Sequence, residues 1–69
     1  MSFKENLAAL QEKNFETNYR LAKSIGVHQT TIAKWRDGLA QPRLEHLGRL
    51  ADHYGCNVNE LVSDKKEMV

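Results

Sequence analysis

The feature that most constrains this chain is a glycine placed between two short apolar patterns of helical spacing. The apolar residues are Leu21, Ala22 and Ile25 before Gly26, and Ile32 and Trp35 after it. A chain that reverses direction within one or two residues needs a positive φ, which glycine adopts at little steric cost. The sequence therefore predicts two short helices that cross closely at Ala22, joined by a tight turn at Gly26.

The two patterns have the spacing of a helix-turn-helix. The remaining face of the second helix carries short or polar residues: His28, Gln29, Thr30, Ala33 and Lys34. Such side chains are able to reach base edges in the major groove of DNA. This face predicts double-stranded DNA as the partner.

The region before the motif predicts one further helix. Ser2 and Glu5 form a capping box, which is typical of a helix start, and the helix is expected to run over residues 3–13. Its inward residues are expected to be Phe3, Leu7 and Leu10. Phe15 is then expected to fill the core.

The two helices of the motif have recognisable limits. Thr17 is a suitable N-cap, and the helix after it is expected to run to about Ser24. The next helix is expected to begin at His28 or the residue before it and to end near Asp37 and Gly38, a helix-stop signal.

The region after the motif predicts a loop containing Pro42 and two more helices. The inward residues of the fourth helix are expected to be Leu44, Leu47, Leu50, Ala51 and Tyr54, with Gly55 at its end. Asn57 predicts the N-cap of a short fifth helix carrying Val58, Leu61 and Val62. No strand pattern is present, so the sequence predicts an all-α, compact five-helix bundle.

Length and composition bound the function. A chain of 69 residues predicts one domain over residues 1–69, with a frayed tail at 62–69. No apolar run is long enough for a membrane span and no signal segment is visible, so we expect a cytoplasmic protein. The single cysteine, Cys56, excludes an intramolecular disulfide and is expected to be a small buried hydrophobe.

Positive charge is concentrated around the motif. The whole chain has a net charge of +1, but residues 17–43 carry five basic side chains against the single acidic Asp37. Attraction of DNA phosphates requires such a distribution. Arg36 is expected to face sideways, as a solvated surface charge outside the site.

Catalytic and metal chemistry have no pattern to support them. His46 and His53 are seven residues apart, whereas metal ligands on one helix are usually closer and have cysteine or carboxylate partners. The sequence has no triad spacing and no glycine-rich phosphate loop. We expect no catalytic residue, cofactor, metal or small-molecule ligand.

The assembled residues resemble the phage repressor and Cro-like helix-turn-helix family, also called the XRE family. The resemblance covers roughly residues 3–62. It rests on these elements in order: Leu21-Ala22-x-x-Ile25-Gly26-Val27, Ile32-x-x-Trp35, Gly38-x-x-x-Pro42, Leu47-x-x-Leu50-Ala51 and Val58-x-x-Leu61. The resemblance implies a five-helix fold that binds operator DNA as a two-fold dimer and regulates transcription, most simply as a repressor.

The resemblance also implies roles for individual residues. The third helix is expected to be the recognition helix, with base contacts from His28, Gln29, Thr30, Ala33 and Lys34. The DNA backbone is expected to be contacted by Thr17, Asn18, Lys23, Gln41 and Arg43, with Arg43 placed to enter the minor groove. Asn18 stands where the family often has glutamine, and Trp35 where it usually has an aliphatic residue.

Two questions remain open from the sequence. Val58, Leu61 and Val62 fit either the core or a dimer surface, and the resemblance favours a weak or DNA-assisted homodimer through the last helix. The near-neutral charge and the apolar last helix also fit a protein-interaction module, such as an antitoxin or anti-repressor, that keeps the fold.

Overall fold

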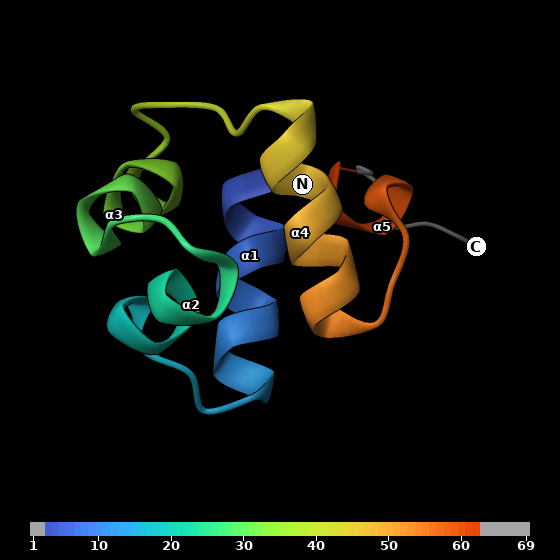
Figure 1. Ribbon diagram of the computed structural model, residues 1–69, viewed down its shortest axis with the longest axis horizontal. Coiled ribbons are helices and arrows are strands. Elements are labelled where there is room, and N and C mark those ends of the chain that lie inside the picture. The colour runs from blue at the N-terminus through green and yellow to red at the C-terminus, as the bar shows by residue number, and fades with distance from the viewer. Residues whose placement is uncertain (1–2, 63–69) are drawn as a thin grey trace.

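The structure is a computed structural model that describes residues 3–62, and these residues form five helices and no strand (Figure 1). The helices are α1 (Phe3–Lys13), α2 (Asn18–Ile25), α3 (Gln29–Asp37), α4 (Leu44–Tyr54) and α5 (Val58–Val62). The predicted all-α five-helix bundle is thus confirmed. The expected N-cap Ser2 and the tail after Val62 lie outside the described residues.

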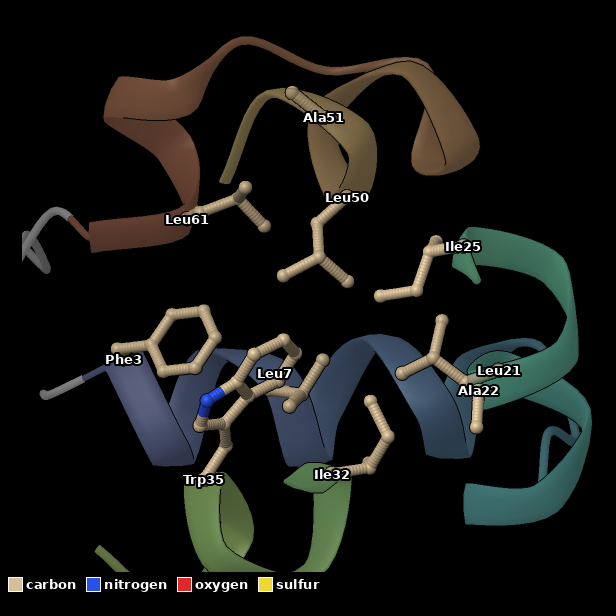
Figure 2. Close-up of a cluster of buried hydrophobic side chains, with 10 residues drawn as sticks. All are labelled: Phe3, Leu7, Leu21, Ala22, Ile25, Ile32, Trp35, Leu50, Ala51 and Leu61. Carbon is tan, nitrogen blue, oxygen red and sulfur yellow. The ribbon is translucent and has the colours of Figure 1, made fainter. Parts of the chain in front are cut away.

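Helix α1 lies in the middle of the bundle (Figure 1), with α2 and α3 on one side and α4 and α5 on the other. All five helices contribute to one core, which Figure 2 shows as side chains that point toward one another. Its buried members are Phe3, Leu7, Leu21, Ala22, Ile25, Ile32, Trp35, Leu50, Ala51 and Leu61. The spacing of these residues is the spacing that the sequence analysis used, so the periodic apolar positions predict most of the core.

The predicted helix starts in the middle and at the end of the chain are confirmed. The Thr17 hydroxyl accepts a hydrogen bond from the backbone N–H of Arg20 at 3.1 Å. At the start of α5, the N–H of Glu60 donates to the Asn57 side chain at 3.0 Å, and the Glu60 carboxylate accepts from the N–H of Asn57 at 3.2 Å. Both arrangements satisfy N–H groups that have no partner within the helix.

The prediction that Phe15 fills the core is wrong. Its side chain is 92% exposed and its φ is +52°. The backbone explains this position, because the N–H of Phe15 donates to Glu12 O and the N–H of Glu16 to Gln11 O, at 3.2 and 2.9 Å. This pair of bonds ends a helix with one left-handed residue, usually glycine. Phe15 fills that position, and its side chain points away from the bundle.

The prediction that Leu44 faces the core is also wrong. Leu44 is 77% exposed, and Arg43 and Glu45 beside it are exposed as well. Within this first turn, His46 packs against Trp35 of α3 and Leu47 lies against the core, whereas Leu44 lies on the side that faces solvent. Leu47 and Tyr54 are partly buried against the core, as is Leu10 of α1.

The connection between α1 and α2 is held by the end of α4. The carboxylate of Glu16 accepts hydrogen bonds from His53 Nε2 at 2.6 Å and from the hydroxyl of Tyr54. Burial, together with the bond to this carboxylate, raises the pKa of Tyr54. Tyr54 therefore remains a protonated donor, and the loop just before Thr17 is fixed to a helix that lies far away in the sequence.

Replacing Phe15 with glycine is expected to stabilise the fold. A non-glycine residue in the left-handed region costs about 1–2 kcal/mol, and the freedom that glycine gains on unfolding offsets roughly 0.5–1 kcal/mol of this. The free energy of unfolding, measured by denaturant titration, is expected to rise by roughly 0.5–1 kcal/mol. Phe15→Ala is the control, because it removes the exposed ring but keeps the strain; an equal gain in both variants would contradict the strain argument.

Candidate nucleic-acid interface

The two sides of α3 differ completely in exposure. Ile32 and Trp35 are 0% and 2% exposed, and they anchor the helix to the core (Figure 2). The ring of Trp35 packs edge-on against Phe3 of α1, with ring centroids 6.0 Å apart, and lies 5.5 Å from the ring of His46 on α4. The residues predicted to contact bases lie on the outer side: His28, Gln29, Thr30 and Lys34 are exposed, and Ala33 is partly exposed.

The turn before α3 has the geometry that the sequence predicts. Gly26 has a φ of +79°, and the N–H groups of Gly26 and Val27 both donate to Ala22 O, at 2.9 and 3.0 Å. Arg49 on α4 closes the turn from outside, because its Nη1 donates to Ile25 O at 3.1 Å. The sequence analysis did not assign Arg49; its place one residue before the buried Leu50 gave no indication of this contact.

Two helix N-termini belong to the motif. His28 is the N-cap of α3, but its side chain makes no capping hydrogen bond. The first N–H groups of an α-helix have no partner within the helix, and they attract anions. Thr17 caps α2, and Asn18 follows as the first residue of that helix. Both starts therefore combine polar side chains with backbone donors.

A buried polar side chain, Gln11, joins three helices beneath the motif. Gln11 is 2% exposed, and its Oε1 accepts from Arg36 Nη1 of α3 at 2.5 Å. Its Nε2 donates to Asn18 Oδ1 of α2 at 3.0 Å. The interpretation of Arg36 as a solvated surface charge is thus wrong, because its side chain is partly buried and bonds to α1. The sequence did indicate that Gln11 is buried, because it lies four residues after Leu7 on the inward face of α1.

The other residues predicted to contact the DNA backbone are exposed around α3. Lys23 lies over the ring of Tyr19, 5.6 Å from its centroid. A shallow hollow of about 240 Å³ lies between α2 and the start of α3 and is lined by Tyr19, Ala22, Lys23, Val27, His28 and Gln29. Gln41 and Arg43 are exposed in the connection from α3 to α4, which Figure 1 shows as a long excursion across one edge of the bundle.

The residues predicted for a dimer contact are separated from this face. Helix α5 lies on the opposite side of α1 from α3 (Figure 1). Leu61 is 0% exposed and belongs to the core, so it offers no surface to a second copy. Val58 is partly buried against the core, and Val62 is 42% exposed.

The remaining candidate ligands have structural roles. His46 packs against Trp35, and His53 bonds to Glu16. Cys56 is partly buried against the core, and burial raises the pKa of its thiol. Residues 3–62 contain no group of three or more potential metal ligands. Among these same residues, no helix has the length and apolar character needed to cross a membrane.

The fold and the outward face of α3 define a helix-turn-helix DNA-binding domain. The sequence-family model named Cro/C1-type HTH DNA-binding domain matches residues 8–67. The chain belongs to this family. The family comprises DNA-binding transcription regulators, and the predicted resemblance to phage repressors is confirmed.

Two curated relatives regulate transcription. The chain is 30% identical over 66 residues to the HTH-type transcriptional activator BcrR of Enterococcus faecalis, covering 96% of this chain and 32% of BcrR. It is 39% identical over 46 residues to the cryptic phage CTXphi transcriptional repressor RstR of Vibrio cholerae, covering 67% of this chain and 41% of RstR. The chain thus spans less than half the length of either relative.

Solved structures share the fold. The SOS-response transcriptional repressor LexA from Eubacterium rectale is 39% identical with a TM-score of 0.90, and the match covers 97% of this chain and 71% of that one. A transcriptional regulator from Listeria innocua is 31% identical with a TM-score of 0.86, with 99% and 64% covered. The P22 c2 repressor, solved with a synthetic operator, is 23% identical with a TM-score of 0.87, with 94% and 98% covered.

Replacing glycine with alanine is expected to have opposite effects in the turn and in a helix. Gly26→Ala adds a Cβ that meets Arg49 Nη1 at an ordinary 3.5 Å, so its expected cost is backbone strain, about 1–2 kcal/mol. Gly48→Ala lies within α4 with nothing within 4 Å of the added Cβ, and is expected to stabilise by about 0.5–1 kcal/mol. Thermal unfolding of both variants measures this; equal stability of the two would contradict the role of the turn.

Proposed function

We propose that the chain binds a specific double-stranded operator as a homodimer and represses transcription by occupying it. The observation that carries this proposal is the separation of α3 into a buried side and a polar outer side. Ile32 and Trp35 leave no freedom for the helix to rotate, so the outer side chains are the ones presented to a partner. An α-helix with such a side fits the major groove.

Sequence is read, in this proposal, by the outer side of α3. The Gln29 carboxamide is suited to paired hydrogen bonds with adenine, and Lys34 to the acceptors of guanine. Thr30 lies one turn before Lys34 and reaches the same strip of base edges. Ala33 offers a methyl group to thymine, and His28 stands at the helix entrance.

Affinity comes, in this proposal, from phosphate contacts that flank the recognition helix. Lys23 and Arg43 supply charge, and Gln41 supplies a neutral donor from the connection after α3. Thr17 and Asn18 stand at the start of α2, where backbone N–H groups favour an anion. These contacts carry no sequence information, but they set the register of α3 in the groove.

The proposed dimer is a two-fold one. It would place two recognition helices about 34 Å apart, matching half-sites one helical turn apart. With Leu61 in the core, Val62 and the accessible part of Val58 are the apolar residues left on α5 for a weak contact.

The direction of regulation is argued from the two relatives. Sequence identity to the repressor RstR supports repression, whereas sequence identity to the activator BcrR supports activation. We favour repression because the higher of these two identities, 39%, is the one to RstR.

A second candidate function is a protein-interaction module. The exposed Leu39 and Leu44, at 76% and 77%, favour it, because both lie at the connection from α3 to α4 and neighbouring apolar side chains in solvent mark interaction sites. A gel-shift assay against genomic fragments at low salt separates the two functions. Retardation of DNA supports the regulator, and its absence supports the interaction module.

Selection of bound duplexes from a random pool tests the proposal directly. The chain is expected to return a consensus with two-fold symmetry. Gln29→Ala is then expected to cost about 1–3 kcal/mol of binding free energy on the selected duplex and little on random DNA, because the side chain reads a base. Equal losses on both duplexes, measured by fluorescence anisotropy, would show that Gln29 does not read sequence.

The phosphate contact of Arg43 is tested by salt. Each neutralised phosphate contributes about 0.9 to the slope of log affinity against log salt concentration. Arg43→Ala is expected to reduce the magnitude of this slope by about one unit per protomer. Arg43→Lys keeps the charge and is expected to leave the slope unchanged; a slope that is the same in all three proteins would exclude the contact.

A further inference from the structure

We propose that Gln11 is a positioning residue for DNA binding. Held by Arg36, its carboxamide orients the side chain of Asn18 so that the NH₂ group of Asn18 faces outward, toward a DNA phosphate. This inference rests on the proposed function, because it assigns an orientation to one of the proposed phosphate contacts. The observation behind it is a buried glutamine on the apolar face of α1, bonded at both ends of its amide.

Arg36 determines which way the Gln11 amide points. A guanidinium has donors only, so the atom of Gln11 that faces Arg36 Nη1 at 2.5 Å is the oxygen Oε1. The Gln11 amide is nearly inaccessible to water, at 2% exposure, so no solvent competes for this bond. The NH₂ group of Gln11 must then point the other way, toward α2.

Gln11 in turn determines which way the Asn18 amide points. An NH₂ group donates, so the atom of Asn18 that it meets at 3.0 Å is the oxygen Oδ1. The Nδ2 of Asn18 donates no hydrogen bond to any of the described residues. The two donors of that NH₂ group therefore face away from Gln11, beside the first turn of α2, whose capped start faces the same solvent.

This orientation matters because the amide of asparagine has one attractive and one repulsive end toward phosphate. An NH₂ group donates to phosphate oxygens, whereas Oδ1 would repel them. A side chain fixed with its donors outward also loses less rotational freedom on binding. Because the same Gln11 amide bonds to Arg36 of α3, the phosphate donor on α2 is held in register with the recognition helix.

Gln11→Glu is the informative change. Glutamate has nearly the same shape and still accepts from Arg36, so the melting temperature is expected to stay within a few degrees of the unsubstituted chain. Its carboxylate cannot donate to Asn18 Oδ1. The Asn18 amide is then expected to turn its NH₂ group inward and its oxygen outward. Affinity for the duplex selected from the random pool is expected to fall about tenfold.

The added negative charge is controlled by repeating the change in an Asn18→Ala background. A general charge effect lowers affinity equally in both backgrounds, whereas an effect through Asn18 disappears when its amide is gone. Gln11→Met is a neutral variant whose side chain packs in the core and makes no hydrogen bond to Asn18. Its loss of affinity is expected to be about threefold, and again only when Asn18 is present.

A readout without DNA checks the orientation itself. In the unsubstituted chain, the side-chain NH₂ of Asn18 is expected to exchange its protons quickly with water in NMR spectra. In Gln11→Glu, the same NH₂ group is expected to exchange more slowly, since it donates to a buried carboxylate. Equal exchange in the two proteins would overturn the proposed orientation.

The outcomes separate this inference from the proposed function. A tenfold loss in Gln11→Glu that vanishes in the Asn18→Ala background supports the positioning role. The same loss in both backgrounds overturns it, and so does the absence of any loss, while operator binding stands. If the unsubstituted chain selects no duplex at all, the proposed function fails and the positioning role fails with it.

Discussion

The burial of Ile32 and Trp35 is the constraint on which the arrangement of this molecule depends. These two side chains lie three residues apart on α3 and are almost inaccessible to solvent, so they fix the rotation of the helix about its own axis. Trp35 contacts rings on both α1 and α4, which holds α3 from two directions. The identity of the outward residues then follows from helical geometry alone.

The sequence predicts what depends on neighbours along the chain. The apolar spacing of residues 21–35, the caps at Thr17 and Asn57 and the glycine turn at Gly26 all depend on neighbouring residues, and all are confirmed. Phe15 shows how this reasoning fails. The chain needs a left-handed residue after α1 just as it does after α2, but here a phenylalanine fills the position. The prediction that Phe15 fills the core rested on its aromatic side chain and took no account of this backbone requirement.

The sequence did not predict contacts between residues that are distant along the chain. Arg49 to Ile25 spans 24 residues, Arg36 to Gln11 spans 25 and His53 to Glu16 spans 37. Each depends on a crossing of two helices and on the rotamer of a long side chain, which residue spacing does not encode. The burial of Leu61 has the same origin, because α5 could be judged as core or surface only once its packing against α1 and α4 was known.

These three long-range contacts have one property in common: each fixes a boundary of the helix-turn-helix. Glu16 is tied to α4 just before Thr17, Arg49 binds the last carbonyl of α2, and Gln11 joins the start of α2 to the end of α3. Burial of Ile32 and Trp35 sets which side of α3 faces outward, but a bundle this small buries little apolar surface, so the core constrains the helix ends less tightly than the helix centres. Polar bonds at helix ends are directional and allow one arrangement. They therefore contribute mainly to the fixed geometry of α2 and α3, which a helix that must match the spacing of base edges requires.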